Sequence, residues 1–450
     1  MYTSDAMEWK EVRKGIWERP LDGLEGYFKV SADLAAAACE GREHYVVFSV
    51  LKVDLRMEDV VGSLKRAWTM MRHKLPHMAS VVDNDRFVYD VISETSGLAK
   101  WLDATFVVAD EHDSKELAGK HKPLTQAALY YLPKSSELAF RIHHHLIDGT
   151  GVLMFWHCFF TALASPADVA FGDEYKRLPP TMSHLLGFPR PPSQELCERA
   201  HQMFLEWAAN IPAIGVPNRA GETPSKQPQT EQLLFSQQMT ERLVQACKQR
   251  GVTVTSAVHA ATILTMEKYA DPNVKQSEYR TVCQFNLRSY LPAPYNSTDY
   301  AVSSYVGALP YNIDLPASFW DLTEDLNKYY KSAFKTDPDI LELECELGRN
   351  VHRAFQQPEV QASPIPKDPI VSSLGVFENH MQRHYGDFIT VNDFSMTVEC
   401  ILGMSTLFVY TFRDQLRLGY CFNDAFQDPN DIQTYLLEIQ NILTQELQLD

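Results

Sequence analysis

Apolar positions along the chain recur with two different periods, and turn-forming residues separate the segments. Residues 45–51 form an uninterrupted apolar run rich in β-branched and aromatic side chains, which predicts a buried strand. Residues 57–75 carry apolar side chains at helical spacing and end before Pro76, which predicts a helix. Residues 127–132 and 138–142 predict two strands that a short turn joins into a hairpin. The first half therefore mixes strands and helices.

The same alternation returns in the second half, after a change in composition. Residues 211–228 contain four prolines and two glycines, with few apolar side chains after Val216, which predicts a surface linker. Three further elements are predicted beyond it: a helix from Thr253 to about Tyr269, a hairpin of residues 407–412 and 416–422, and a helix over 429–447.

This order of elements predicts an α/β (α+β) protein with two lobes, each a mixed sheet with helices. We place the N-terminal lobe at residues 1–210, the linker at 211–232 and the C-terminal lobe at 233–450. A chain of 450 residues is long enough for two such units.

Charge and cysteine usage exclude several classes of protein. The formal net charge is −17 and no basic stripe occurs, so we expect no nucleic-acid partner. The sequence contains no run of about eighteen apolar residues, so we expect no membrane span. The first seventeen residues lack the apolar core of a secretory signal. The eight cysteines are scattered without a C-x-x-C pair, which favours buried free thiols in a reducing compartment. We therefore expect a cytoplasmic protein.

One polar cluster interrupts the pattern, between the strand predicted at 138–142 and a helix predicted over 151–163. It reads His143-His144-His145-Leu146-Ile147-Asp148-Gly149-Thr150-Gly151. By composition alone, the pattern His-His-x-x-x-Asp-Gly is expected in on the order of one such chain in a thousand. A strand end presents side chains at a surface while the strand fixes the backbone. We expect Gly149 and Gly151 to permit an unusual backbone there, beside a helix N-terminus that favours negative charge.

These residue types suit proton transfer. Imidazole takes up a proton near neutral pH, so a presented histidine can act as a general base on an alcohol or amine. An aspartate four residues further on can hold a basic partner or nearby backbone groups and keep the turn in shape. The chain has no G-x-S-x-G nucleophile elbow, so the residues favour direct transfer over a covalent acyl-enzyme.

Two other interpretations of the histidines stay open. A single buried histidine is structural more often than it is catalytic. On a strand, His143 and His145 point to the same face and would supply two metal ligands. No C-x-x-C pair supplies the remaining ligands, so we predict no metal site.

The run His143-His144-x-x-x-Asp148-Gly149 resembles the signature of the CoA-dependent acyltransferase superfamily. This superfamily joins chloramphenicol acetyltransferase, plant BAHD acyltransferases, carnitine acyltransferases and the condensation domains of peptide synthetases. Residues 17–28 resemble the opening of fungal O-acetyltransferases of the trichothecene 15-O-acetyltransferase kind, and Arg288 lies in a segment similar to the family's arginine-bearing strand end. Further similar segments are residues 371–375 and 393–399. The resemblance extends over about residues 9–445.

The resemblance implies two chloramphenicol-acetyltransferase-like lobes with a tunnel between them, in which an acyl thioester and an acceptor meet at the second histidine. By position it makes His144 the base, and Asp148 a structural residue turned from the substrates toward an arginine, for which Arg288 is our candidate. Plant members have Asp-Phe-Gly-Trp-Gly where this chain has Asp-Phe-Ser-Met-Thr at 393–397, which disfavours plant-type acceptors. Ser395 or Thr397 is a candidate for the tunnel wall, and loop packing is the alternative.

Other residues carry weaker signals. Arg349 and Arg353, four positions apart, suit the phosphates of CoA, although a solvated helix face is the commoner explanation. We expect His259 to pack against its own helix, and Phe155 and Trp156 to form core beneath the histidine motif.

We therefore predict an O-acyltransferase that moves an acyl group, expected to be acetyl, from acyl-CoA to a hydroxyl of a specialised metabolite such as a terpenoid or polyketide alcohol. Acyl-CoA is a co-substrate here and no cofactor is permanently bound. The expected partners are the small-molecule alcohol and acyl-CoA, without a membrane, and the expected state is a monomer. Three alternatives stay open: ester or amide formation from a carrier-protein-bound acyl chain, a non-transferase member that uses the tunnel for binding or cyclisation, and an interaction protein with a decayed site.

Overall fold

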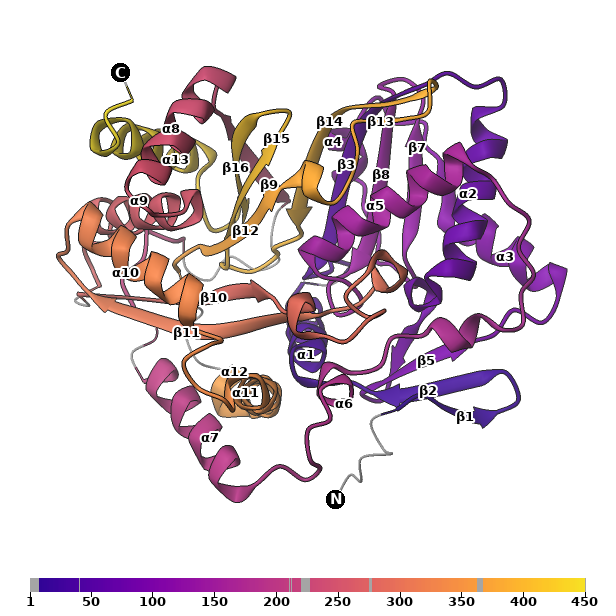
Figure 1. Ribbon diagram of the computed structural model, residues 1–450, viewed down its shortest axis with the longest axis horizontal. Helices are drawn as coiled ribbons and strands as arrows, with labels where there is room; N and C mark the ends of the chain where they lie inside the picture. Colours follow the sequence, from indigo (N-terminus) through magenta and orange to yellow (C-terminus); the bar gives the residue numbers. More distant parts are fainter. Residues whose placement is uncertain are drawn as a thin grey trace.

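A computed structural model describes most of the chain, and two main sheets lie next to each other in it (Figure 1). The described residues are 8–39, 41–209, 211, 213–219, 227–274, 277–361 and 367–449. Each main sheet carries helices, as expected for the predicted two-lobed α/β class.

The first sheet has six strands in the order β13-β14-β3-β8-β7-β6. Its strands are β3 Val46–Leu55, β6 Phe106–Val108, β7 Ala128–Leu132, β8 Glu137–His143, β13 His384–Tyr385 and β14 Ile389–Val398. The helices of this half are α2 Val60–Lys74, α3 Thr95–Thr105, α4 Ser114–Ala118 and α5 Gly149–Ala164. Phe155 of α5 stacks on Phe140 of β8 with ring centres 4.0 Å apart, and Trp156 of α5 donates to the Ser49 hydroxyl of β3. Helix α5 is thus fixed to the middle of the sheet.

The second sheet has four strands in the order β12-β15-β16-β9. Its strands are β9 Pro228–Leu234, β12 Ile370–Val376, β15 Thr406–Phe412 and β16 Gln415–Asn423, and its helices are α8 Gln237–Gln249, α9 Val254–Lys268, α10 Phe319–Ser332 and α13 Pro429–Glu446. Ten of the fifteen residues of α9 are buried, so this helix forms the centre of the second core.

Strand β14 connects the two halves of the chain. It lies late in the sequence but pairs antiparallel with β3, with Met396 opposite Ser49. Asp393 of the same strand forms an ion pair with Arg417 of β16, at 2.5 Å. The second half of the chain therefore completes the first sheet and is tied there to the second sheet (Figure 1).

A two-stranded ribbon and a group of helices lie below the two sheets in Figure 1. The ribbon pairs β10 Glu278–Asn286 with β11 Val306–Asp314, and the helices are α1 Gly23–Ala38, α6 Met182–Leu185, α7 Gln194–Ala208, α11 Ile340–Phe355 and α12 Pro358–Gln361. A small four-stranded sheet contains β1 Lys10–Arg13, β2 Ile16–Pro20, β5 Arg86–Asp90 and β4 Val81–Asp83. Short 3₁₀ turns cover Pro76–Ala79, Glu174–Arg177, Arg288–Tyr290, Thr298–Tyr300 and Phe377–Asn379.

The elements predicted from apolar periodicity are all present, with shifted ends. The hairpins predicted at 127–142 and 407–422 are β7–β8 and β15–β16, and the predicted helices are α2, α5, α9 and α13. Phe155 and Trp156 are fully buried, as predicted. The division of the chain into 1–210, 211–232 and 233–450 stays a prediction.

The predicted linker is only partly a surface segment. Residues 212 and 220–226 lie outside the described residues. Ile214 and Val216 are buried in the second core, and β9 already begins at Pro228. The prolines and glycines correctly indicated that the described residues of 211–227 form neither helix nor strand. The apolar residues between them nevertheless pack into the protein core.

The cysteines are free thiols, as predicted, and seven of the eight are buried. None of the helices in the described ranges is both long and apolar enough to cross a membrane.

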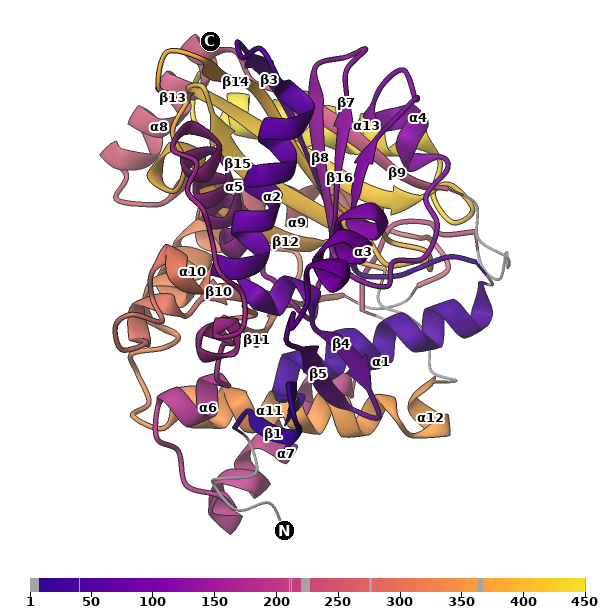
Figure 2. The same ribbon diagram turned by 90° about the vertical axis from the view of Figure 1, so that its right-hand side faces the viewer.

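Helices α1 and α11 lie side by side, and glycines allow their close approach (Figure 2). A Cβ atom added to Gly348 of α11 would lie 3.2 Å from the backbone of Gly23. We predict that Gly348→Leu lowers the free energy of unfolding by about 2 kcal/mol, because the helices must separate. Urea denaturation measures this. Gly97→Ala in α3 is the control, because nothing lies within 4 Å of its added Cβ; equal stability of both variants would contradict the packing argument.

Candidate active site

The histidine motif lies where β8 ends and α5 begins. The strand ends at His143, and the His144 amide donates to the carbonyl oxygen of Tyr45 at 2.8 Å. Asp148 then caps α5, because its Oδ1 accepts from the Gly151 amide at 2.8 Å. The strand pairing and the cap together fix the turn that carries His144.

The His144 ring packs between aromatic side chains. It stacks on Phe28 with ring centres 4.1 Å apart, and Tyr45 meets it edge-on at 6.1 Å. Its Nδ1 atom is buried and has no hydrogen-bond partner of normal geometry among the described residues. Burial lowers the pKa of His144 below 6.5, although nearby backbone groups and the charge of Asp148 partly offset this effect. The ring is therefore held in place and kept neutral near neutral pH.

The Asp148 carboxylate is fully engaged with protein donors. Oδ1 accepts from Gly151 and from Arg288 Nη1 at 2.8 Å each, and Oδ2 accepts from Arg288 Nη1 at 2.7 Å and from the Tyr305 amide at 2.8 Å. No hydrogen bond joins Asp148 to His144 within the described chain. This carboxylate holds the backbone and Arg288 and is not placed to receive a proton from the imidazole.

Arg288 is the expected partner of Asp148, and both side chains are almost fully buried. Arg288 follows β10, far from the motif in sequence, and its Nη2 also donates to the carbonyl oxygen and the hydroxyl of Ser303. The ion pair therefore ties the start of α5 to the segment between β10 and β11.

The two motif glycines have a different role from the one expected. Neither Gly149 nor Gly151 has a positive φ, so the prediction of an unusual backbone is wrong. A Cβ atom at Gly151 would lie 2.3 Å from the carbonyl oxygen of Ala301, and one at Gly149 would lie 2.5 Å from the Leu374 side chain. Lack of space, and not the backbone angles, requires glycine at both positions.

His143 and His145 share one face, but their rings stack on each other at 4.9 Å. His143 Nε2 lies 3.0 Å from Glu43 Oε1, and burial lowers the pKa of His145 well below its ordinary value. Among the described residues, no group of three or more histidine, cysteine, aspartate or glutamate side chains is arranged to bind a metal.

A cavity lies against His144, and both halves of the chain contribute to its wall. Besides His144, its polar lining is Asp148, Gln284 and Ser372, and the other lining residues are Val47, Gly149, Val306, Met396, Val398 and Phe408. They come from β3, the motif, β10, β11, β12, β14 and β15. Sequence reasoning missed Gln284, and it named Ser372 only within the similar segment 371–375, because the alternation of a strand does not show which of its faces meets the cavity.

Other candidate residues lie elsewhere or have other partners. Met396 and Val398 line the cavity, so Ser395 and Thr397 lie on the opposite side of β14, and the expectation that one of them forms the wall is wrong. His259 is buried, as expected of a packing residue, but its partners are the hydroxyls of Tyr279 on β10 and Tyr330 on α10 and not its own helix.

The two arginines of α11 are engaged in ion pairs. Arg349 contacts Asp22 at 2.6 Å and Glu346 at 3.1 Å, and Arg353 contacts Glu346 at 2.5 Å. The Arg349 side chain is mostly buried, so it is neither a solvated residue nor free for CoA phosphates.

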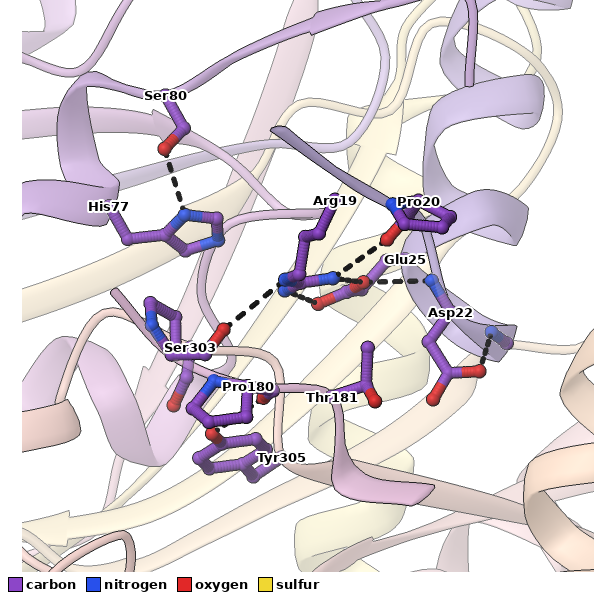
Figure 3. A network of polar contacts seen from close by, with 12 residues as sticks. Arg19, Pro20, Asp22, Glu25, His77, Ser80, Pro180, Thr181, Ser303 and Tyr305 are labelled. Carbon is purple, nitrogen blue, oxygen red and sulfur yellow. Dashed lines mark hydrogen bonds and ion pairs between the residues drawn. The ribbon is translucent and has the colours of Figure 1, made fainter. Parts of the chain in front are cut away.

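A polar network joins the opening segment of the chain to the segment that holds Tyr305 (Figure 3). Arg19 pairs with both oxygens of Glu25 at 2.7 Å, and Tyr305 donates from its hydroxyl to the carbonyl oxygen of Pro180 at 2.9 Å. The amide of Tyr305 is one of the donors to Asp148. Arg19 Nε also donates to the carbonyl oxygen of Pro179 at 3.2 Å, so the opening segment, whose residues 17–28 carried part of the family resemblance, is tied to the segment that contacts Asp148.

Known proteins are similar to this sequence over nearly its whole length. The chain is 30% identical over 460 residues to the acetyltransferase pigO of Monascus ruber, covering 98% of both chains. It is 29% identical over 454 residues to the O-acetyltransferase pigM of Monascus ruber, covering 99% of this chain and 88% of that one. No family model matches the chain.

A solved structure shares the fold. The TRI3 trichothecene 15-O-acetyltransferase from Fusarium sporotrichioides superposes with a TM-score of 0.83 at 17% identity, covering 100% of this chain and 99% of that one. The fold and the sequence relatives define an acyltransferase. The chain belongs to the same family as pigO, within the CoA-dependent acyltransferase superfamily.

We predict that Asp148→Asn lowers the free energy of unfolding by about 3 kcal/mol, because it leaves the buried Arg288 guanidinium without a counter-charge. Turnover should fall with it, because the turn that carries His144 loses its anchor. Urea denaturation and a turnover assay measure the two effects. The matched control is Asp168→Asn at an exposed position, and a variant at 148 that equals this control in stability would refute the anchoring role.

Proposed function

We propose that the protein is an O-acetyltransferase that moves an acetyl group from acetyl-CoA to a hydroxyl of a specialised metabolite, a terpenoid or polyketide alcohol. One observation carries the proposal: the His144 ring borders the cavity between the two halves, while Asp148 is occupied by four hydrogen bonds. His144 is then the one titratable side chain at this cavity that is available as a base, among the described residues.

In this mechanism His144 acts as the general base. A neutral imidazole accepts the proton of the acceptor hydroxyl as the oxygen attacks the thioester carbonyl carbon. The tetrahedral intermediate then collapses, the carbon–sulfur bond breaks, and the imidazolium returns its proton to the departing thiolate. No acyl-enzyme forms, and the histidine ends each cycle in its starting state.

The rest of the cavity suits a neutral, largely apolar acceptor. Its wall is mostly apolar, and its two uncharged polar side chains, Gln284 and Ser372, make no hydrogen bond with any other described residue. These groups are free to orient the acceptor or to donate to the thioester carbonyl. Because one chain forms the whole wall, we infer that a monomer is sufficient for activity.

The choice of acetyl and of an oxygen acceptor rests on the relatives. PigM is named an O-acetyltransferase, pigO an acetyltransferase, and the structural neighbour a trichothecene 15-O-acetyltransferase.

We predict that wild-type protein releases free thiol from acetyl-CoA only when an acceptor alcohol is present. His144→Ala should lower this turnover at least about 100-fold and keep the fold, because general-base catalysis contributes 10²–10⁴-fold. A free-thiol assay over a panel of hydroxylated terpenoids and polyketides measures it, with the surface variant His112→Ala as control. A folded His144→Ala protein with near-normal turnover would exclude His144 as the base. Thiol release only from a carrier-protein-bound acyl donor would exclude acetyl-CoA as the donor.

The pH dependence follows from the burial of His144. The base is active when neutral, and burial lowers its pKa, so activity persists to lower pH than an exposed histidine allows. We predict that kcat/KM falls as the pH drops, with a midpoint below 6.5. Steady-state rates across the acid range test this, and a midpoint above 6.5 would contradict a buried, neutral base.

A further inference from the structure

A second cavity lies next to the one that contains His144. Its lining residues are Asp22, Gly23, Leu24, Glu25, Met182, Ser304, Val306, Glu344 and Cys345. Val306 of β11 lines both cavities, so the two spaces adjoin at this residue. This second cavity is here called the inner pocket.

Glu344 is the unusual residue of the inner pocket. Its side chain, on α11, is only 2% exposed, and one carboxyl oxygen accepts from the Ala308 amide of β11 at 3.1 Å. The other oxygen has no hydrogen-bond partner among the described residues. The two acidic neighbours in the lining, Asp22 and Glu25, are instead paired with Arg349 and Arg19. Glu344 is thus the unpaired acid of this pocket.

An unpaired, buried carboxyl group is stable as the neutral acid. Burial raises the pKa of Glu344 to about 8, the Ala308 amide lowers it, and the charge of Asp22 raises it. Near neutral pH the free oxygen therefore carries a proton and can donate a hydrogen bond into the pocket. A second polar atom of the lining, the Ser304 hydroxyl oxygen, is buried and likewise has no partner in the described part of the chain.

We propose that the inner pocket is a binding subsite for a neutral oxygen of the acceptor, a carbonyl or a hydroxyl, which accepts a hydrogen bond from Glu344. The acceptor would reach past Val306, with its reacting hydroxyl at His144 and a second oxygen at Glu344. The phosphates of CoA do not fit here, because the lining has carboxyl groups and no free cation among the described residues. This subsite rests on the proposed function, and it makes an oxygenated alcohol the preferred class of acceptor.

The proton on Glu344 can be tested without turnover. Infrared difference spectra of wild type against Glu344→Gln isolate the band of this one carboxyl group. The expected result is a protonated-carboxyl band at pH 7 that disappears as the pH rises above about 8. A Glu344 that is already ionised at pH 7 would overturn the proposed donor.

The ligand is tested with ω-hydroxy-2-alkanones of about four to ten carbons, each compared with the 1-alkanol of the same length. At the chain length that spans the two cavities, wild type should prefer the ketone by about 10- to 100-fold in KM, the worth of one buried hydrogen bond. Glu344→Leu should abolish this preference, Glu344→Gln should retain much of it, and Glu342→Leu on the same helix should behave as wild type.

The possible outcomes separate this inference from the function itself. If Glu344→Leu raises the KM of acetyl-CoA instead, the pantetheine arm occupies the inner pocket and the acceptor assignment is wrong. If no alcohol is turned over, the proposed function fails, and calorimetric dissociation constants for the same compounds still compare wild type with Glu344→Leu. Equal affinity of both proteins for ketone and alkanol at every length overturns the subsite.

Discussion

The buried ion pair between Asp148 and Arg288 is the interaction on which the site depends. It joins the start of α5 to the segment between β10 and β11. The Tyr305 amide and the Gly151 amide at the N-terminus of α5 donate the remaining hydrogen bonds to the carboxylate. A buried charge is costly without its partner, so neither residue can move independently. The aspartate of the motif therefore holds the turn that carries His144 and makes no hydrogen bond to its ring within the described chain.

The cavity exists only because distant parts of the chain meet around this pair. Strand β14 belongs to the second half of the sequence but completes the first sheet, and it places Met396 and Val398 in the cavity wall beside His144. The ribbon β10–β11 contributes Gln284 to the cavity beside His144, and Val306 of the same ribbon lines both this cavity and the inner pocket. The cavity beside His144 is thus a space that neither half of the chain encloses alone.

The sequence predicted what short-range patterns determine. Apolar periodicity gave the hairpins and helices, and the polar run after β8 gave His144, Asp148 and, through the family resemblance, Arg288 as the buried partner. The register between strands that lie far apart in the sequence could not be predicted from these patterns. Whether Ser395 or Met396 faces the cavity depends on how β14 pairs with β3, and one residue of register reverses the answer. Gln284 and Glu344 carry no local signal, because their roles arise only where β10, β11 and α11 meet.

A double-mutant cycle of Asp148 and Arg288 measures whether Asp148 acts through Arg288. Asp148→Asn, Arg288→Met and the double variant are compared in kcat/KM and in free energy of unfolding. If Asp148 acts through Arg288, the double variant loses no more kcat/KM than the worse single variant, and its loss of stability is smaller than the sum of the two single losses by about 2 kcal/mol. Losses that multiply in kcat/KM and add in stability would show that Asp148 contributes to the chemistry independently of Arg288.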